Sequence, residues 1–211
     1  MPIYWGRRLI KNRGDSGVYY GGRKIKFVYF GNRLVYSYES YDPGTKVVNI
    51  TNGTSKTITL LPGVYQLKAA GGGGNPVTWV YSGYAWALGG GGGGAVEGTF
   101  YLPSAASFVC SAGAAKQATT IKKNGTTVVT CNNGTSPTAG GSNGKGGTAS
   151  YTSGIGAISM TATKGKDAKG GNTVYGGVSV SSKKWGAGKT LQNSNEFQYG
   201  GIEIIYLRRW Q

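Results

Sequence analysis

Runs of glycine limit the possible folds of this chain more than any other feature of its sequence. Residues 89–94 are six consecutive glycines and residues 71–74 are four more, with glycine pairs at 140–141, 146–147 and 170–171. Flexible linkers are one interpretation, but a linker separates domains once or twice, whereas these runs recur between strand-like segments. The alternative is the left-handed polyglycine II helix, with three residues per turn, in which bare backbones pack side by side and exchange hydrogen bonds. Six glycines in that form span about 19 Å.

The rest of the composition favours an ordered chain with a thin aliphatic core. Glycine contributes 40 of the 211 residues, far above the roughly 7% that is usual in proteins. The 15 tyrosines and 5 tryptophans bury large areas with few rotatable bonds and are uncommon in disordered segments. We therefore expect a folded chain that packs partly through its backbone and gains buried surface by oligomerisation.

Beyond residue 41 the chain alternates β-type segments with glycine-rich links, and no apolar pattern of helical period and length occurs. The expected strands are residues 46–51, 56–60, 61–69, 77–81, 98–102, 107–110, 119–122, 126–130, 157–162, 174–180 and 201–207. The sequence therefore predicts an all-β fold, a glycine-rich β-sandwich or jelly-roll-like module in which the glycine runs are loops or polyglycine II.

Asn-Gly dipeptides, which favour two-residue hairpin turns, begin at Asn52, Asn124 and Asn133, and a threonine follows each of them. The three sites also fit the glycosylation acceptor pattern. Because no signal peptide is visible, we interpret all three as hairpin turns followed by a β-branched strand residue.

The first part of the chain carries a degenerate repeat, Tyr-aromatic-Gly-x-Arg-x-aliphatic, whose copies begin at Tyr4, Tyr19 and Tyr29. Two aromatics before a glycine and an aliphatic residue after it are typical of a short hairpin, so the repeats predict a small β-hairpin meander. The composition changes at the Pro-Gly turn after Tyr41. We therefore divide the chain into residues 1–41 and residues 42–211.

Two further features bound the environment of the chain. No stretch of about 18 apolar residues occurs, and no apolar segment follows Arg7 and Arg8, so we expect neither a membrane span nor a signal peptide, and synthesis in a cytoplasm. Cys110 and Cys131 each lie in an expected strand. A cross-strand disulfide is compatible with that placement, but a reduced, buried pair is favoured.

The residue types needed for catalysis are nearly missing, so we expect no enzyme activity, no cofactor and no metal. The chain has no histidine, the commonest general base and metal ligand, and only 7 acidic residues, none closely spaced. We interpret Glu97 and Glu203 as partners of nearby Lys or Arg. Gly188-Lys189-Thr190 ends like a phosphate-binding loop but lacks the first glycine of that motif, and the adhesion tripeptide at residues 13–15 is most simply a charged turn.

A resemblance to bacteriophage proteins rests on the two ends of the glycine-rich part. The segment Leu-Pro-Gly-Val-Tyr-Gln-Leu-Lys-Ala-Ala followed by four glycines, residues 61–74, resembles the opening of glycine-rich modules in phage tail-fibre and adhesin proteins. Gly-Gly-Ile-Glu-Ile-Ile-Tyr, residues 200–206, resembles their final strand. The resemblance brackets about three quarters of the chain and implies a virion structural protein, assembled as a homo-oligomer, with a trimer favoured. The chain lacks the heptads and the extended shaft of long tail fibres.

The aromatic stretch at residues 79–86, between the two largest glycine runs, is the candidate receptor contact. Strand alternation puts Trp79 and Tyr81 on one face, and Tyr84 and Trp86 form a second pair. Flat aromatic rings stack on sugars or bases and tolerate wet interfaces. The other interpretation is that these rings fill the core of a protein poor in aliphatic residues, and the sequence alone favours it.

The formal charge of +16 indicates an anionic partner. The basic residues of the first segment are candidates for docking to an acidic virion surface: Arg7, Arg8, Arg23, Lys24 and Arg33. Binding of single-stranded nucleic acid and a plain solvated face are the alternatives, and both are less favoured.

Together these expectations describe a non-enzymatic virion protein of the tail-fibre or tail-tip type that binds a glycan or protein receptor on the host surface. The expected partners are other virion proteins. A head fibre or capsid decoration protein that stabilises the shell is the close alternative, and a nucleic-acid-binding protein is the third.

Overall fold

The computed structural model describes residues 3–5, 8–10, 12–13, 17–20, 23–25, 27–30, 33–37, 41–169, 177, 179–188 and 198–209. The chain divides into two compact units, Met1–Tyr41 and Asp42–Gln211. No helix in the part of the chain described here has the length and apolar character needed to cross a membrane.

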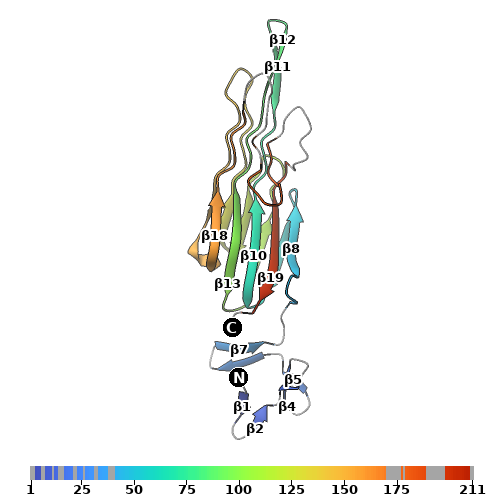
Figure 1. The fold of residues 1–211 in the computed structure, drawn as a ribbon, viewed down its shortest axis with the longest axis vertical. Coiled ribbons are helices and arrows are strands. Elements are labelled where there is room, and N and C mark those ends of the chain that lie inside the picture. The colour runs from blue at the N-terminus through green and yellow to red at the C-terminus, as the bar shows by residue number, and fades with distance from the viewer. Residues whose placement is uncertain are drawn as a thin grey trace. The chain divides into compact units, whose positions relative to one another are not determined.

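The first unit consists of short antiparallel strands (Figure 1). They are β1 (Ile3–Trp5), β2 (Arg8–Ile10), β3 (Asn12–Arg13), β4 (Gly17–Tyr20), β5 (Arg23–Ile25), β6 (Phe27–Phe30) and β7 (Arg33–Ser37). In each repeat the aromatic before the glycine is the Cα partner of the arginine: Trp5 with Arg8, Tyr20 with Arg23, and Phe30 with Arg33. The expectation of one hairpin for each copy is therefore confirmed. The hairpins form three small sheets, β1-β2, β3-β4-β5 and β6-β7, instead of one continuous meander.

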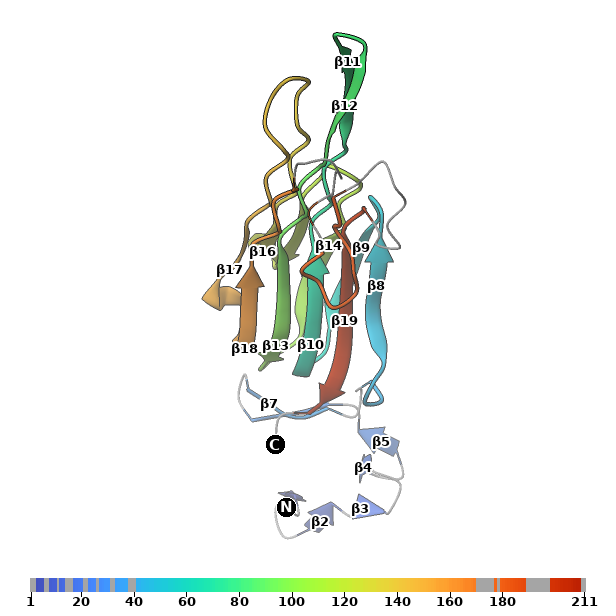
Figure 2. The same ribbon diagram turned by 45° about the horizontal axis from the view of Figure 1, so that its top comes forward.

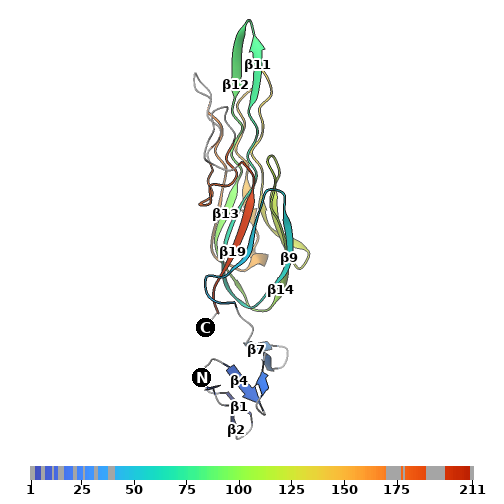
Figure 3. The ribbon, with the colours of Figure 1, turned by 90° about the vertical axis from the view of Figure 1, so that its right-hand side faces the viewer.

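The second unit is a β-sandwich of two five-stranded antiparallel sheets (Figures 2 and 3). The first sheet has the order β18 (Ala157–Thr163), β13 (Ala95–Leu102), β10 (Gly63–Ala70), β19 (Gly201–Arg208), β8 (Lys46–Thr51). The second has the order β17 (Ala149–Tyr151), β16 (Thr126–Cys131), β15 (Thr119–Lys123), β14 (Ala106–Ser111), β9 (Ser55–Leu60), and a single 3₁₀ turn, η1 (Ser153–Ile155), follows β17. The predicted all-β sandwich is confirmed.

Aromatic rings fill the space between the sheets where aliphatic residues are scarce. The ring of Tyr65 on β10 stacks on Phe100 of β13 at 5.3 Å and meets Tyr206 of β19 edge-on at 5.3 Å. Phe100 reaches across to Phe108 of the second sheet at 6.0 Å. Each such pair adds about 0.5–1.5 kcal/mol beyond its buried area. The Tyr65 hydroxyl donates to the Leu61 carbonyl at 2.6 Å, so the polar end of this buried ring is satisfied.

Cys110 and Cys131 are both free and buried in the second sheet, as expected for a reduced pair. Cys110 lies on β14 and Cys131 on β16, and β15 separates the two strands. Burial raises the pKa of each thiol to about 12. Both thiols are therefore protonated and unreactive at neutral pH.

The three Asn-Gly dipeptides, each predicted to form a hairpin turn, adopt three different structures. Asn124 has a φ of 49° and its glycine 83°, and they join the paired strands β15 and β16, so this hairpin is confirmed. Asn52 also makes a turn with positive φ, but β8 and β9 on its two sides belong to different sheets, so it is a corner between sheets. The hairpin predicted at Asn133 is wrong, because this segment runs extended beside the glycine runs, and Gly134 N donates to Gly72 O at 2.9 Å.

The predicted strand boundaries hold to within a few residues where the chain alternates, with two departures, and two observed strands, β12 (Tyr84–Leu88) and β17, were not predicted. The strand expected at 98–102 begins at Ala95, because β13 stays paired with β10 up to the glycine run. Of the strand expected at 174–180, residues 177, 179 and 180 lie in no strand and the others lie outside the described residues.

Candidate functional site

A lattice of glycine backbone lies at one end of the sandwich. Residues 71–74 continue directly from β10, and residues 89–94 lead directly into β13. Figure 1 shows these segments, together with the later glycine-rich ones, rising side by side between the sandwich and the hairpin of β11 and β12. Asp42, where the second unit begins, precedes β8 at the opposite end of the sandwich.

The hydrogen bonds of residues 71–74 repeat every three residues. The donors and acceptors are Gly71 N to Gly94 O (2.9 Å), Gly72 N to Gln117 O (2.9 Å), Gly73 N to Gln198 O (2.6 Å) and Gly74 N to Gly91 O (2.8 Å). The first and fourth residues thus bond to the same neighbour, and the two between bond to two others. Three residues per turn with lateral hydrogen bonds is the pattern of polyglycine II.

The run at 89–94 is the centre of this lattice and exchanges backbone hydrogen bonds with six segments. Its N–H groups donate to the carbonyls of three segments, at residues 132 and 135, at residue 166 and at residue 186. Its carbonyls accept from the N–H groups of three others, at residues 71 and 74, at residues 144 and 147, and at residue 177. A flexible linker would not have its backbone groups paired in this way. The linker interpretation of these two glycine runs is therefore wrong.

Close packing is the reason that these positions are glycine. None of the glycines in the two runs has a positive φ, so backbone conformation alone would allow other residues there. A Cβ on Gly73 would lie 1.9 Å from the Ala187 carbonyl oxygen, and one on Gly91 would lie 2.0 Å from that of Lys145. Side chains are therefore excluded by neighbouring backbone.

The outer segments of the lattice carry a small residue at every third position, a signal that strand alternation and glycine runs do not reveal. Gly144 and Gly147 donate to the central run, and Gly165 and Ala168 donate to Gly147 and Gly144. All four residues are buried, whereas Lys145 and the residues 166 and 167 between them are exposed. A search for small residues with a period of three would have found these segments.

The lattice carries a two-stranded hairpin at its end, formed by β11 (Val77–Tyr81) and β12 (Tyr84–Leu88). The turn residues Ser82 and Gly83 have φ of 50° and 76°, as a type I′ turn requires. The Ser136 hydroxyl accepts from the Asn75 N–H at 2.9 Å, and the Asn75 side chain accepts a hydrogen bond from the Gln198 amide. These contacts hold the first strand where it leaves the lattice.

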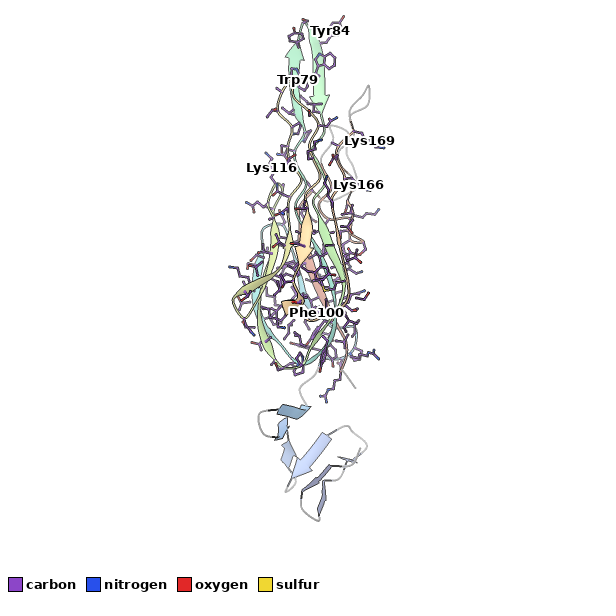
Figure 4. The ribbon with its side chains drawn as sticks, turned by 90° about the vertical axis from the view of Figure 1, so that its left-hand side faces the viewer. Trp79, Tyr84, Phe100, Lys116, Lys166 and Lys169 are labelled. Atoms are coloured by element: carbon purple, nitrogen blue, oxygen red, sulfur yellow. The ribbon has the colours of Figure 1, made fainter. Side chains whose placement is uncertain are left out.

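The structure brings the four candidate receptor-contact residues onto one face of this hairpin. Trp79 is the Cα partner of Trp86, and Tyr81 is the partner of Tyr84, and directly opposed residues share a face. The two tryptophan rings stack with centroids 6.4 Å apart. The sequence predicted two separate pairs, whereas the pairing register makes one group. Figure 4 shows Trp79 and Tyr84 on this hairpin, beyond the lattice.

The hairpin aromatics are exposed, so the interpretation of these rings as core filling is wrong for three of the four. The exposed fractions are 70% for Tyr81, 73% for Tyr84 and 53% for Trp86, and Trp79 is half-buried. Val80 on the other face is 73% exposed. Large apolar groups exposed together are typical of an interaction surface.

Of the candidate docking residues in the first unit, Arg7 lies outside the described residues. Arg8 begins β2, Arg23 and Lys24 lie in β5, and Arg33 begins β7. Arg8, Arg23 and Arg33 thus occupy the same position in three hairpins, which follows from the repeat.

The carboxylates of Glu97 and Glu203 serve as structural partners. Glu203 is buried and pairs with Lys46 at 3.1 Å and Lys183 at 3.0 Å. Burial by itself would raise the pKa of Glu203, but hydrogen bonds from the two lysines outweigh it and lower the pKa. The prediction of a basic partner is confirmed for Glu203. Glu97 instead accepts hydrogen bonds from the Ser181 hydroxyl at 3.0 Å and the backbone N–H of residue 182 at 2.7 Å.

The phosphate-binding-loop match and the adhesion tripeptide noted in the sequence form no binding site in the described residues. Gly188 belongs to the lattice, where its N–H donates to Gly177 O at 2.7 Å, and the two residues that follow it lie outside the described part. Arg13 ends β3, and the rest of its tripeptide lies outside as well. Within the described ranges no group of three or more Cys, Asp or Glu residues could hold a metal ion.

A groove of about 420 Å³ lies on the outer face of the first sheet, over β10, β13 and β18. Its polar lining comprises Gln66, Lys68, Glu97, Ser159, Thr161 and Thr163. Among the described residues that line it there is no aromatic ring, and Lys68 and Glu97 balance in charge. It therefore lacks the exposed aromatic rings that the hairpin offers to a partner.

Comparisons with known proteins identify no relative. No family model matches the chain, and neither the curated proteins nor the solved structures contain a significant match.

Proposed function

We propose that this chain is a non-enzymatic attachment protein of a bacteriophage virion, of the tail-fibre or tail-tip type, which binds a receptor on the host surface through the hairpin of β11 and β12. The observation that supports this proposal best is the exposure of Tyr81, Tyr84 and Trp86 on one face of that hairpin. Exposed aromatics bind partners with little loss of side-chain entropy, because they have only two rotatable bonds.

The glycine lattice supports the proposal because it presents the hairpin on a stiff base. If residues 71–94 formed a flexible loop, they would be mobile, and ordering them on binding would weaken the affinity for the receptor. Here the segments on both sides of the hairpin, 71–74 and 89–94, are bonded to each other and to the surrounding segments. The aromatic face is therefore preorganised.

The two ends of the second unit suit two different tasks. The chain enters this unit at Asp42, at the end of the sandwich opposite the hairpin. In our proposal the basic hairpin unit, residues 1–41, docks on other virion proteins through its arginines, and the aromatic hairpin of the second unit binds the receptor. Several copies on a symmetric particle would then convert weak contacts into avid binding.

The experiment measures binding of the full chain to intact candidate host bacteria and, in parallel, to virions stripped of it. The variant Tyr84→Ala/Trp86→Ala removes two exposed rings. The control Ile158→Ala removes an apolar side chain that is 48% exposed on β18 of the sandwich. We expect the double variant to bind cells at least about tenfold more weakly, as for the loss of a central aromatic contact, and the control to bind like the wild type.

Two outcomes would reject the attachment function. Binding to stripped virions alone, without binding to cells, would make this chain a decoration protein of the particle. Equal loss of cell binding in the double variant and in the control would show that the hairpin is not the contact surface.

A further inference from the structure

The outer segment at residues 164–169 has three edges, because its backbone repeats every three residues. Gly165 and Ala168 form the inner edge, where Gly165 N donates to Gly147 O at 2.8 Å and Ala168 N to Gly144 O at 2.9 Å. A Cβ on Gly165 would lie 2.1 Å from the carbonyl oxygen of Gly92 in the central run. This edge is therefore closed by the lattice.

The second edge, Lys164 and Asp167, is neutralised within the lattice. The Asp167 carboxylate accepts from the Gly146 N–H at 2.7 Å and lies 3.6 Å from the Lys164 ammonium and 3.8 Å from that of Lys145. The hydrogen bond from Gly146 is the main cause of the lowered pKa of Asp167, and the two lysines act in the same direction. Asp167 is thus ionised at neutral pH, and its carboxylate already has Gly146, Lys145 and Lys164 as partners.

The third edge, which we call the basic edge, consists of Lys166 and Lys169. Both side chains are exposed, and neither has an ion-pair partner among the residues that the structure describes. Three residues of this backbone rise by about 9 Å, so the Cα atoms of the two lysines lie roughly that far apart along the same edge. Two unpaired cations on one edge attract anionic groups.

The basic edge reaches the base of the aromatic hairpin. Ala168 bonds to Gly144, and Gly144 N donates in turn to Gly89 O at 2.9 Å. Gly89 directly follows β12, so Lys169 lies at the level where the hairpin leaves the lattice. Figure 4 shows Lys166 and Lys169 on one flank below Trp79 and Tyr84, with Lys116 on the other flank.

We propose that the basic edge and the aromatic face of the hairpin form one surface that binds an acidic polysaccharide. Its carboxylate groups would pair with Lys166 and Lys169, and its sugar rings would stack on Tyr81, Tyr84 and Trp86. This inference rests on the proposed attachment function and names the chemical class of the receptor.

The residue types favour a polysaccharide over a nucleic acid. The cations beside the hairpin are lysines, which are strongly hydrated point charges, whereas planar, bidentate recognition of phosphates is typical of arginine. A groove for single-stranded nucleic acid also follows the backbone with a longer row of cations. Here the basic edge has only two cations, which lie below the aromatic hairpin on one flank (Figure 4), and this suits an acidic sugar chain with widely spaced charges.

The experiment uses the full chain and three immobilised polymers at about 0.15 M ionic strength: polygalacturonate, neutral dextran and single-stranded oligothymidylate. The variant is Lys166→Gln/Lys169→Gln. The matched control is Lys122→Gln/Arg208→Gln, which removes the same charge from exposed positions on β15 and β19 of the sandwich. We expect polygalacturonate affinity to fall at least tenfold in the variant and less than threefold in the control, and dextran to bind weakly to all three proteins.

Three results would overturn the inference: no binding of polygalacturonate by the wild type, equal losses in the variant and the control, or tighter binding of oligothymidylate than of polygalacturonate. Cell binding separates this failure from that of the proposed function. If Lys166→Gln/Lys169→Gln binds host cells like the wild type while Tyr84→Ala/Trp86→Ala does not, the attachment function stands and the acidic polysaccharide is rejected. If the wild type binds no cells, the attachment function itself fails.

Discussion

A single methyl group in the centre of the glycine lattice should destabilise the second unit strongly. In Gly91→Ala the new Cβ would lie 2.0 Å from the Lys145 carbonyl oxygen, which must retreat by about 1.4 Å to reach an ordinary contact of 3.4 Å. No rotamer change can relieve this contact, because the obstructing atom belongs to the backbone.

The expected magnitude follows from the hydrogen bonds that this retreat would break. Gly91 N donates to Thr135 O at 2.9 Å, Gly91 O accepts from Gly74 N at 2.8 Å, and Thr135 N donates to Lys145 O at 2.9 Å. Each is worth a net 0.5–1.5 kcal/mol, as a rough guide, and overpacking adds about 1–3 kcal/mol. We therefore expect a loss of roughly 2.5–7.5 kcal/mol in the free energy of unfolding, a large share of the roughly 5–15 kcal/mol available to a domain.

The assay is equilibrium unfolding in urea, followed by tryptophan fluorescence, with hydrogen exchange measured for residues 71–74 and 89–94. The control is Gly154→Ala in the 3₁₀ turn, where the new Cβ would have its nearest neighbours at 3.4 and 3.5 Å and the φ is not left-handed. We expect this control to stay within about 0.5 kcal/mol of the wild type. If Gly91→Ala matches the control in both stability and exchange, the glycines are not required for packing and the lattice argument fails.

Two further predictions concern buried ionisable residues of the sandwich, Glu203 and the two cysteines. The lowered pKa of Glu203 stabilises the fold above the ordinary carboxyl pKa of 4.5, and this contribution is lost as pH falls through the folded-state value. Glu203→Gln should therefore flatten the acid limb of the stability profile measured by urea unfolding. An unchanged limb would show that the ion pairs with Lys46 and Lys183 contribute nothing to stability. Cys110 and Cys131, with pKa values raised to about 12 by burial, should resist alkylation at pH 8 in the native protein and react in denaturant, as read by mass spectrometry; rapid labelling of native protein would contradict their burial.

Features that depend on local chemistry could be predicted from the amino-acid sequence. The Tyr-aromatic-Gly-x-Arg repeat encodes hairpins, because a glycine-containing two-residue link closes each pair of short strands. Alternating β-branched residues and the lack of helical periodicity fixed the strands of the sandwich, most of them to within a few residues. The reduced state of the two cysteines followed from their apolar strand context.

Which turns join paired strands, and which face of a strand is exposed to solvent, became clear only from the folded chain. Asn52 and Asn124 look alike in sequence, yet one turn joins two sheets and the other joins two neighbouring strands, because sheet membership depends on partners far away in the chain. For the same reason, the sequence could not show whether the four aromatics of the β11–β12 hairpin are buried in the core or exposed to solvent. The exposure of three of them follows from the position of β11 and β12 beyond the lattice, where no second sheet of the described residues covers them.

The glycine lattice combines both kinds of information. A run of six glycines allows either a mobile linker or close-packed backbone, and the run itself has no side chain to favour one of them. What decides between them is the set of neighbours that residues 89–94 meet, from residues 71–74 to residue 186, which only the folded chain brings together. The small residues spaced three apart at 144 and 147 and at 165 and 168 were the local sign of that packing, because in a helix with three residues per turn they all face the same neighbour.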